Sequence, residues 1–354
     1  MTLPSAGFWR GRRVLLTGHT GFKGSWAALW LDTLGAEVSG FALAPEGAPA
    51  QHFNLAKAEE ALAAHRIGDL RDRDAVEQAV RAAKPQMVIH MAAQALVRHS
   101  LRNPQKTWET NVLGTLHVLS TIRHHAPEAV VLVVTSDKVY ANDDSGRAFA
   151  EDAPLGGKDP YSASKAACEI LTASHRTSYF ARAGQPLATV RGGNVIGGGD
   201  FAEDRVVPDI VRAALAGQPV ALRHPEATRP WQHVLDCLCG YLLYAEALAN
   251  GRVPPALNIG PEPGSVATVQ AATEAIAGRL GMDPAWRHEP VPGSVEARML
   301  SLDASLARRT LGWQDRLPGK AALDWTAAWY AAWRAGADMA AFSRDQIARY
   351  GALS

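Results

Sequence analysis

Short apolar runs alternate with amphipathic stretches along the first half of the chain. The run from Val130 to Val134 is β-branched and too short for a helix, which is typical of a strand buried in a parallel sheet. Helical patterns begin near Trp26, near Asn103 and at Asp159. Strands are predicted at 13–16, 37–42, 66–70, 87–90, 130–134 and 187–191. The alternation of strands and helices predicts an α/β fold with a doubly wound parallel sheet.

The composition of the sequence changes after residue 191. The stretch from Gly192 to Asp200 is rich in glycine, which is typical of a loop that follows a strand and wraps a ligand. Further helices are predicted at 206–216 and around Tyr241. We therefore expect one domain at 1–191, with a segment near 231–250 returning to it. A second, smaller domain is expected to comprise mainly 192–354.

Charge and cysteine content argue against several functional classes. The chain has 354 residues, a formal net charge of +1 and 20% charged residues, so we expect no nucleic-acid or membrane partner. Three cysteines give no disulfide framework. Cys237 and Cys239 point to different sides of a predicted helix, so no metal site is expected. Without a signal peptide or a membrane span in the sequence, we expect a cytoplasmic protein.

A glycine-rich turn joins the first predicted strand to the first helix. Gly18 is placed to allow a tight turn, Gly21 to let backbone N–H groups approach a pyrophosphate, and Gly24 to allow close packing of the helix. The pattern is not that of a nucleotide-hydrolysing loop, because Lys23 precedes Gly24 rather than following it. Strand, glycine turn and helix together predict a dinucleotide-binding site.

Four polar residues follow the strand 130–134 at the edge of the sheet where chemistry usually occurs: Thr135, Ser136, Asp137 and Lys138. On the helix that begins at Asp159, Tyr161 and Lys165 stand four residues apart and share a face. An ammonium beside a phenol favours the phenolate, so we expect Lys165 to lower the pKa of Tyr161. Such a tyrosine can accept a proton from a sugar hydroxyl.

Other candidate cofactor contacts each have an ordinary structural alternative. Lys23 is either a phosphate contact or a solvated side chain, and Asp69 either meets an adenine amino group or sits in a surface turn. Ala92 and Ala93 are small enough for close approach by a flat cofactor. The second strand ends without an acidic residue for the ribose, so its sequence does not distinguish NAD from NADP.

Candidate substrate contacts are dispersed over the second half of the chain. Arg205, Arg229 and Arg298 are candidate clamps for a diphosphate, because guanidinium geometry matches phosphate oxygens. His233 lies in a polar and aromatic segment beside Arg229. Asn111 either orders the tyrosine or a water, or is a buried hydrogen-bonding residue of the long helix.

Taken together, the glycine turn, Ser136, Tyr161 with Lys165, and Asn194 resemble the extended short-chain dehydrogenase/reductase family. The resemblance extends from near residue 11 to about 315. It implies a Rossmann domain that binds NAD at the glycine turn, with Thr20, Phe22 and Leu70 as further cofactor contacts, and a second domain for a nucleotide sugar. It also implies Asn111, Asn194 and His233 as substrate contacts and a homodimer or homotetramer paired through the helices 103–125 and 161–180.

Within this family, the Asp137–Lys138 pair resembles the nucleotide-sugar 4,6-dehydratases that act on CDP-glucose. The resemblance implies that Ser136 binds the developing C4 carbonyl, that a protonated Asp137 releases the C6 hydroxyl, and that Lys138 acts at C5. Lys138 is either the base or, if it stays protonated, the group that stabilises the enolate. A dehydratase for a dTDP-, UDP- or GDP-sugar, a 4-epimerase, and a non-enzymatic NAD-binding protein are the alternatives.

Overall fold

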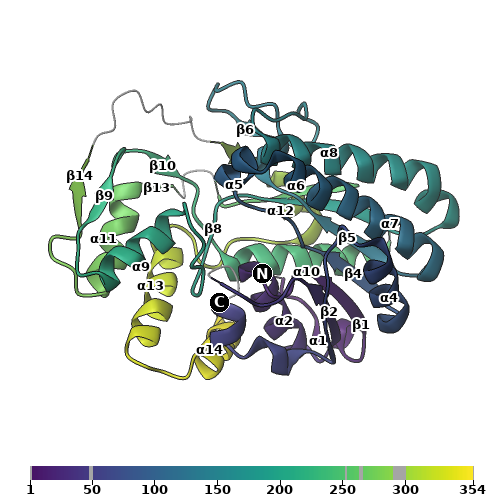
Figure 1. The fold of residues 1–354 in the computed structure, drawn as a ribbon, viewed down its shortest axis with the longest axis horizontal. Helices are drawn as coiled ribbons and strands as arrows, with labels where there is room; N and C mark the ends of the chain where they lie inside the picture. The colour runs from purple at the N-terminus through teal and green to yellow at the C-terminus, as the bar shows by residue number, and fades with distance from the viewer. Residues whose placement is uncertain (1, 48–50, 252, 263–265, 290–299, 354) are drawn as a thin grey trace.

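A seven-stranded parallel sheet forms the centre of the molecule (Figure 1). The computed structural model describes residues 2–47, 51–251, 253–262, 266–289 and 300–353. The strands are ordered β12–β7–β5–β4–β1–β2–β3, and the order reverses between β1 and β4 as in a doubly wound Rossmann sheet. The predicted fold class is therefore confirmed. The strands are β1 (Arg13–Thr17), β2 (Glu37–Ala42), β3 (Ala64–Ile67), β4 (Met87–His90), β5 (Val130–Val134), β7 (Leu187–Gly192) and β12 (Ala256–Ile259).

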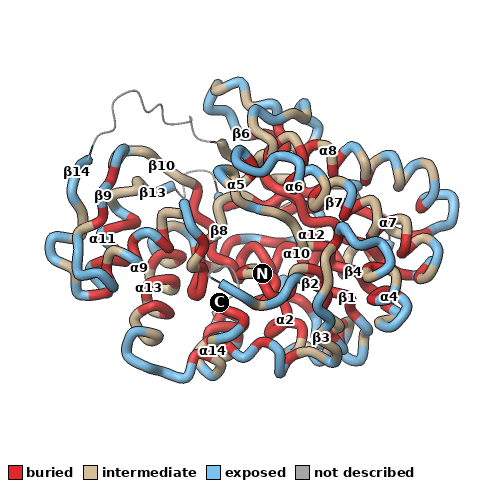
Figure 2. Tube along the Cα trace, viewed as in Figure 1, coloured by how far each residue is buried: buried red, intermediate tan, exposed pale blue. Residues whose placement is uncertain are grey.

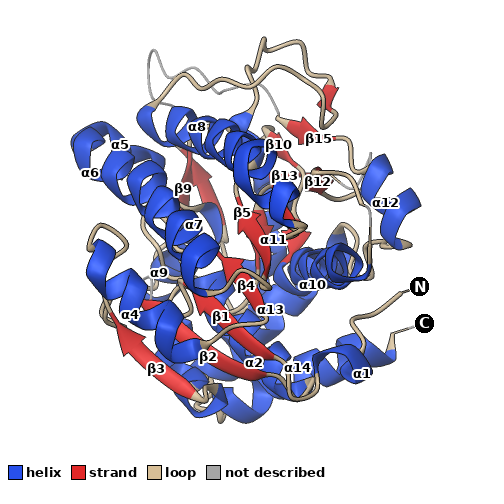
Figure 3. Ribbon diagram, turned by 90° about the vertical axis from the view of Figure 1, so that its right-hand side faces the viewer, coloured by secondary structure: helices blue, strands red, loops and turns tan. Residues whose placement is uncertain are grey.

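Helices cover both faces of the sheet because successive strand residues point to opposite sides. In β1, Val14 and Leu16 belong to one hydrophobic core and Leu15 to the other. One face of the sheet is covered by α2 (Phe22–Thr33), α10 (Val234–Asn250) and α14 (Met339–Ala352). The other face is covered by α4 (Arg73–Ala83) and α7 (Gly114–His125). Helix α8 (Pro160–His175) packs beside α7 (Figure 3). The central strands and α10 are buried along most of their length (Figure 2).

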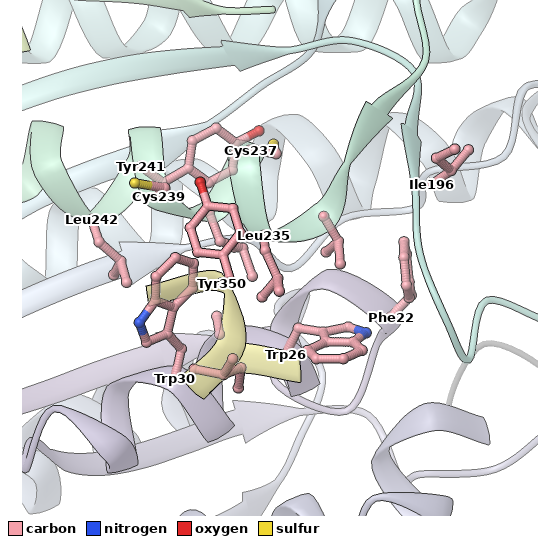
Figure 4. Packing of buried hydrophobic residues seen from close by; sticks show 14 of the residues in the cluster. Phe22, Trp26, Trp30, Ile196, Leu235, Cys237, Cys239, Tyr241, Leu242 and Tyr350 are labelled. Carbon is pink, nitrogen blue, oxygen red and sulfur yellow. The ribbon is translucent and has the colours of Figure 1, made fainter. Parts of the chain in front are cut away.

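Aromatic side chains fill the core between α2, α10 and α14. Figure 4 shows Trp26 and Trp30 of α2 on the side of the cluster that holds Leu235 of α10 and Tyr350 of α14, with Phe22 on the side of Ile196. The rings of Trp30 and Tyr350 meet edge to face with centroids 5.4 Å apart. The last helix is therefore part of the body around the sheet, far along the chain from the helix it covers.

A smaller group of elements lies beside the sheet, at the left of Figure 1. It comprises α9 (Val206–Leu215), β9 (Val220–Leu222), β10 (Thr228–Arg229), β13 (Ala267–Thr268), α11 (Val269–Arg279), β14 (Trp286–His288) and α13 (Lys320–Arg334). The remaining short elements are α1 (Ala6–Trp9), α3 (Gln51–Leu55), α5 (Val97–Arg102), α6 (Pro104–Trp108), β6 (Ala148–Phe149), β8 (Val195–Ile196), β11 (Gln232–His233), β15 (Ser301–Leu302) and α12 (Ser305–Leu311). Within the described ranges, no helix combines the length and the apolar character that crossing a membrane requires.

Two predicted elements differ from the structure. The third strand occupies Ala64–Ile67 rather than 66–70, because Asp69 begins a turn in which its carboxylate accepts a hydrogen bond from the Arg71 N–H at 2.9 Å. The long helix predicted at 103–125 is divided into α6, a π-helical turn at Glu109–Leu113, and α7. A π-helical turn inserts an extra residue and changes which side chains face inward.

A buried pair of carboxyl groups ties the C-terminal segment to α10. Asp236 accepts hydrogen bonds from the N–H of Arg316 at 2.8 Å and from the hydroxyl of Tyr350 at 2.8 Å. Burial, reinforced by the charge of Asp315, raises the pKa of Asp236 to about 7. Burial likewise raises the pKa of Asp315 to about 6.

These raised pKa values predict a pH-dependent stability. Between about pH 4 and 7 the native state binds more protons than the unfolded chain, so the free energy of unfolding should fall as pH rises through this window. Asp315→Asn removes one charge and should reduce the fall between pH 5 and 7 by about 1 kcal/mol, measured by urea unfolding. Asp345→Asn, at an exposed position, should leave the slope unchanged. Equal slopes for wild type and Asp315→Asn would contradict the prediction.

Candidate active site

The glycine turn packs tightly between β1, β4 and the start of α2. Gly18 has a φ of +78°, and a Cβ there would lie 2.7 Å from the Cα of Ala92 just after β4. A Cβ on Gly24 would lie 2.1 Å from the carbonyl oxygen of Gly18. Gly21 is the N-cap of α2 and supplies no capping side chain. The first N–H groups of α2 are therefore oriented toward the turn at a helix N-terminus, which is an anion-binding arrangement that fits the pyrophosphate of NAD.

This packing predicts that Gly24→Ala weakens NAD binding. The added methyl group must displace the backbone at Gly18, since 2.1 Å is far inside van der Waals contact. We expect the Kd for NAD, measured by titration calorimetry, to rise about tenfold or more. Gly278→Ala is the matched control, because nothing lies within 4 Å of a Cβ at that helical position. An unchanged Kd in Gly24→Ala would contradict this view of the turn.

The other candidate cofactor residues differ in their burial and in the contacts that they make. The Thr20 hydroxyl donates to the carbonyl of Leu43 at 3.1 Å, and Lys23 donates to the hydroxyl of Tyr241 at 3.4 Å. Phe22 is part of the hydrophobic core. Ala92 and Ala93 follow β4 and are half-buried.

Asp69 and Leu70 lie at the end of β3 beside α7. Asp69 forms an ion pair with Arg71 at 2.7 Å, and the hydrogen bond from Arg71 holds the pKa of this carboxyl below its usual value. Leu70 is buried, and its carbonyl oxygen lies 2.9 Å from His117 Nδ1. Of the two interpretations of Asp69, a contact to adenine or a residue of a surface turn, the second describes the contacts that it makes in this structure.

The strand β5 ends directly at the candidate catalytic residues. Asp137 to Val139 form a single 3-10 turn, and the Ser136 hydroxyl donates to Asp137 Oδ1 at 2.9 Å while accepting from the Lys138 N–H at 3.2 Å. Asp137 is buried and Lys138 is half-buried. The loop after β7 passes close above, since a Cβ on Gly193 would lie 3.7 Å from Asp137 Oδ2.

Tyr161 enters the site from the first turn of α8. Asp159 caps this helix by accepting from the Ser162 N–H at 3.0 Å, and Pro160 occupies the first helical position. The Tyr161 side chain is buried, and burial raises its pKa to about 12; hydrogen bonding by Ser136 opposes the shift, and the charge of Asp137 adds to it. The phenol therefore keeps its proton at neutral pH in this structure.

The expectation that Lys165 lowers the pKa of Tyr161 is wrong for this structure. Lys165 is buried, and its ammonium donates to the carbonyl oxygen of Val134 at 3.2 Å. Burial also lowers the pKa of Lys165 itself. The effect of removing the phenol from water outweighs any opposite charge nearby.

Arg205 is the candidate substrate residue that the structure brings toward Tyr161. Its charge acts to lower the pKa of Tyr161, and the tyrosine in turn raises the pKa of the guanidinium. Asp200 holds Arg205 through an ion pair at 2.7 Å. The Tyr330 hydroxyl donates to the Asp200 carbonyl oxygen, so helix α13 supports this loop.

Two candidate substrate residues make hydrogen bonds within the protein. Asn111 is buried by the π-helical turn, where its amide donates to the Gln94 carbonyl at 3.0 Å and to the Ser164 hydroxyl at 2.9 Å and its oxygen accepts from the Gln94 N–H. His233 is completely buried and caps α10 by accepting from the Leu235 N–H at 3.3 Å. These bonds support the structural alternative for Asn111, whereas Nε2 of His233 is buried without a hydrogen-bond partner, and a substrate contact by either residue stays a prediction.

The remaining candidates follow the loop around the site. The Asn194 carbonyl accepts from the Gln232 N–H at 3.0 Å, which pairs β8 with β11, and the Asn194 side chain is half-exposed. Arg229 donates to the Thr228 carbonyl at 2.9 Å, and burial lowers the pKa of its guanidinium. Arg298 lies outside the residues that the structure describes.

Sequence reasoning missed two contacts of the site. The Ser100 hydroxyl accepts from the Tyr161 N–H at 3.1 Å and fixes the start of α8, and no pattern in the sequence marks this serine. Tyr241 was assigned only to a helix, yet a Cβ on Gly192 would lie 2.2 Å from its hydroxyl oxygen. The glycine at 192, directly after a buried strand, is the signal that another group approaches closely there.

The sheet, the glycine turn and the Tyr161–Lys165 helix define a Rossmann-type enzyme of the short-chain dehydrogenase/reductase class. The model of the NAD dependent epimerase/dehydratase family matches residues 14–260, and the chain belongs to this family. It is 40% identical to the CDP-glucose 4,6-dehydratase of Salmonella typhimurium over 350 residues, covering 97% of each chain. It is 29% identical to a dTDP-glucose 4,6-dehydratase of Xanthomonas campestris, covering 89% of this chain and 92% of that one.

Solved structures resemble the fold over most of its length. A dTDP-glucose 4,6-dehydratase of Streptomyces venezuelae with NAD bound is 27% identical, with a TM-score of 0.76 over 92% of this chain and 98% of that one. A UDP-glucose 4-epimerase of Thermus thermophilus in complex with NAD is 28% identical, with a TM-score of 0.74 over 90% and 98% of the two chains.

Proposed function

We propose that the protein catalyses the NAD-dependent dehydration of CDP-D-glucose to CDP-4-keto-6-deoxy-D-glucose, the reaction of a hydro-lyase. The observation that carries this proposal is the Asp137–Lys138 pair, which follows Ser136 directly at the end of β5 and lies in the same site as Tyr161. The pair occurs in a chain that is 40% identical over nearly its full length to a CDP-glucose 4,6-dehydratase.

The residues divide the reaction between C4 and the C5–C6 bond of the glucose. Tyr161 takes the proton of the C4 hydroxyl, and the Ser136 hydroxyl stabilises the developing carbonyl. The C4 ketone then acidifies the C5 proton. Transfer of that proton to a base, Lys138 in one of its two proposed roles, and protonation of the C6 hydroxyl by Asp137 release water, and a proton is returned to C5 when hydride is added at C6.

NAD fits the tight glycine turn, where Gly18, Gly21 and Gly24 would hold its pyrophosphate. When bound, NAD would supply a hydride acceptor for C4 and the hydride that is added at C6, and a positive nicotinamide ring near Tyr161 would favour its phenolate. This charge would oppose the effect of burial, which raises the pKa of Tyr161 in the structure.

The substrate diphosphate is assigned to the loop and helix start that carry Arg205. The ion pair with Asp200 fixes the guanidinium near Tyr161. A diphosphate bound by Arg205 would direct the glucose toward the tyrosine. Arg229 and Asn194 are assigned to the nucleotide end.

A substrate panel tests the proposed function. Purified protein with NAD is incubated separately with the CDP, dTDP, UDP and GDP derivatives of glucose or, for GDP, mannose, and products are identified by mass spectrometry and NMR. A 4-keto-6-deoxy product from the CDP sugar supports the proposal. Formation of a galactose epimer, or preference for another nucleotide, would overturn it.

We further propose a cytoplasmic homodimer that pairs through α6, the π-helical turn, and α8. Exposed apolar side chains gather on these elements: Trp108, Leu113 and Ile170, the last 61% exposed. Apolar side chains exposed together are typical of a protein–protein interface. The three cysteines are buried free thiols, and a reducing compartment would keep them so.

Ile170→Asp should dissociate this dimer, because a carboxylate would have to be buried at its centre. We expect the mass measured by light scattering to fall to that of one chain. Leu215→Asp, at a similarly exposed position on α9, should leave the mass unchanged. Equal masses for wild type and Ile170→Asp would place the interface elsewhere.

A further inference from the structure

A buried ion pair lies directly behind the candidate catalytic residues. Glu169 on α8 is four residues after Lys165 and on the same face of the helix. Its Oε2 lies 2.7 Å from Nη2 of Arg191 on β7, and the two side chains are only 4% and 5% exposed. No reaction step assigned above uses either residue.

The carboxylate holds the point at which β5 passes into residues 135–140, which we call the catalytic segment. The Thr135 hydroxyl donates to Glu169 Oε1, and the Thr135 N–H donates to the Val190 carbonyl at 2.8 Å. Lys165 donates to the carbonyl of the preceding residue, Val134, at 3.2 Å. Glu169 and Lys165 thus fix successive residues at the near end of the segment.

The guanidinium holds the far end of the same segment. Arg191 Nη1 donates to the Tyr140 hydroxyl at 2.7 Å and to the Glu151 carbonyl at 2.9 Å. The Tyr140 hydroxyl donates onward to Asn258 Oδ1 at 2.7 Å. Tyr140 follows the 3-10 turn that carries Asp137 and Lys138, so one ion pair connects both ends of that turn.

A buried ion pair adds little to the free energy of unfolding, because the free-energy cost of removing two charges from water offsets most of the attraction between them. Apolar residues of similar volume would serve the core equally well. The pair does provide geometry that apolar residues cannot: directional hydrogen bonds to Thr135 and Tyr140 at fixed distances.

We propose that the Glu169–Arg191 ion pair is a positioning unit that fixes both ends of the catalytic segment. The proposal rests on the proposed dehydratase function for its kinetic consequences, but the geometry it describes belongs to the protein alone. Ser136, Asp137 and Lys138 all lie between the two fixed ends. Loosening either end displaces groups that must meet the substrate within a fraction of an ångström.

The test removes single hydroxyl groups rather than the ions, because deleting Glu169 leaves a buried unpaired charge that would unfold the protein. Thr135→Val frees the near end and Tyr140→Phe frees the far end. Thr189→Val is the matched control: its hydroxyl donates to Glu169 Oε2 at 2.8 Å but lies on β7, outside the segment. All three substitutions nearly keep side-chain volume and remove only hydroxyl hydrogen bonds of the same network: two at Tyr140, two at Thr135 (one of them long, at 3.4 Å) and one at Thr189.

We expect kcat with CDP-glucose to fall roughly tenfold or more in Thr135→Val and Tyr140→Phe, with KM for CDP-glucose nearly unchanged. Thr189→Val should keep the wild-type kcat although its Tm also falls. Equal losses of kcat in all three variants would show a general effect of stability and overturn the proposal. Unchanged kcat in both segment variants would overturn it as well.

Amide hydrogen exchange gives a second readout that needs no substrate. Peptides covering 135–140 should exchange faster in Thr135→Val and Tyr140→Phe than in wild type or Thr189→Val. If wild type is inactive on every sugar nucleotide but exchange follows this pattern, the proposed function fails and the positioning role stands. Exchange that is equal in all four proteins would overturn the positioning role whatever the activity.

Discussion

Tyr161→Phe is expected to lower turnover by about three orders of magnitude, because it removes the hydroxyl oxygen that accepts the C4 proton. The ring itself is buried and would be replaced by one of nearly equal volume, so the fold should persist. NAD binding should be unchanged, since the glycine turn that holds the pyrophosphate lies at the other end of the cofactor site. Product formation under saturating NAD and CDP-glucose measures the first effect, and calorimetry the second.

The control for Tyr161→Phe is a second buried tyrosine that lies away from the site. The Tyr244 hydroxyl on α10 donates to the Pro254 carbonyl. Tyr244→Phe loses one buried hydrogen bond but should retain wild-type turnover. Full activity in Tyr161→Phe, or an equal loss in Tyr244→Phe, would remove Tyr161 from its role.

The elements that carry the site were predictable because their signals are local. Strand β5 lies at the predicted residues, since five consecutive apolar residues leave few alternatives. Helix α8 begins as predicted because Asp159 and Pro160 supply a cap and a first-turn residue. The positions of these two elements are enough to predict that Ser136, Asp137 and Tyr161 lie in one site.

The features that sequence reasoning did not predict depend on residues far apart in the chain. Strand β12 is four residues long and pairs with β7 more than sixty residues earlier, so nothing nearby marks it. The π-helical turn that buries Asn111 has no recognised local signature. Regular helical periodicity therefore did not reveal which hydrogen bonds the Asn111 side chain makes.

The pKa of Tyr161 also depends on residues far apart in the chain and was therefore not predicted from the sequence. Spacing places Lys165 on the correct face of α8 but does not reveal that its ammonium donates to Val134. Burial of the phenol involves residues from several elements, and it outweighs the local pair. Glu169 did carry a local signal, an acid four residues after Lys165, but its partner Arg191 is brought to it only by the sheet.

Lys138→Ala is expected to slow solvent deuterium incorporation at C5 by about 100-fold while affecting C4 oxidation much less. The reason is positional: Lys138 lies in the 3-10 turn directly after Ser136 and Asp137, beyond the residues that contact the C4 hydroxyl. Single-turnover absorbance follows C4 oxidation, and mass spectrometry of the sugar in deuterated water follows C5. Lys158→Ala is the control, because Lys158 is exposed and pairs with Asp144 outside the site.

Lys138→Arg separates the two chemical roles of this lysine. A guanidinium remains charged and can stabilise an enolate, but it cannot accept the C5 proton. If Lys138 acts by charge, the arginine variant should recover much of the deuterium exchange that the alanine variant loses. If Lys138 is the base, exchange in the arginine variant should stay as slow as in Lys138→Ala. Equal losses at C4 and C5 in the alanine variant would contradict both roles, because they would place Lys138 in a step common to the two reactions.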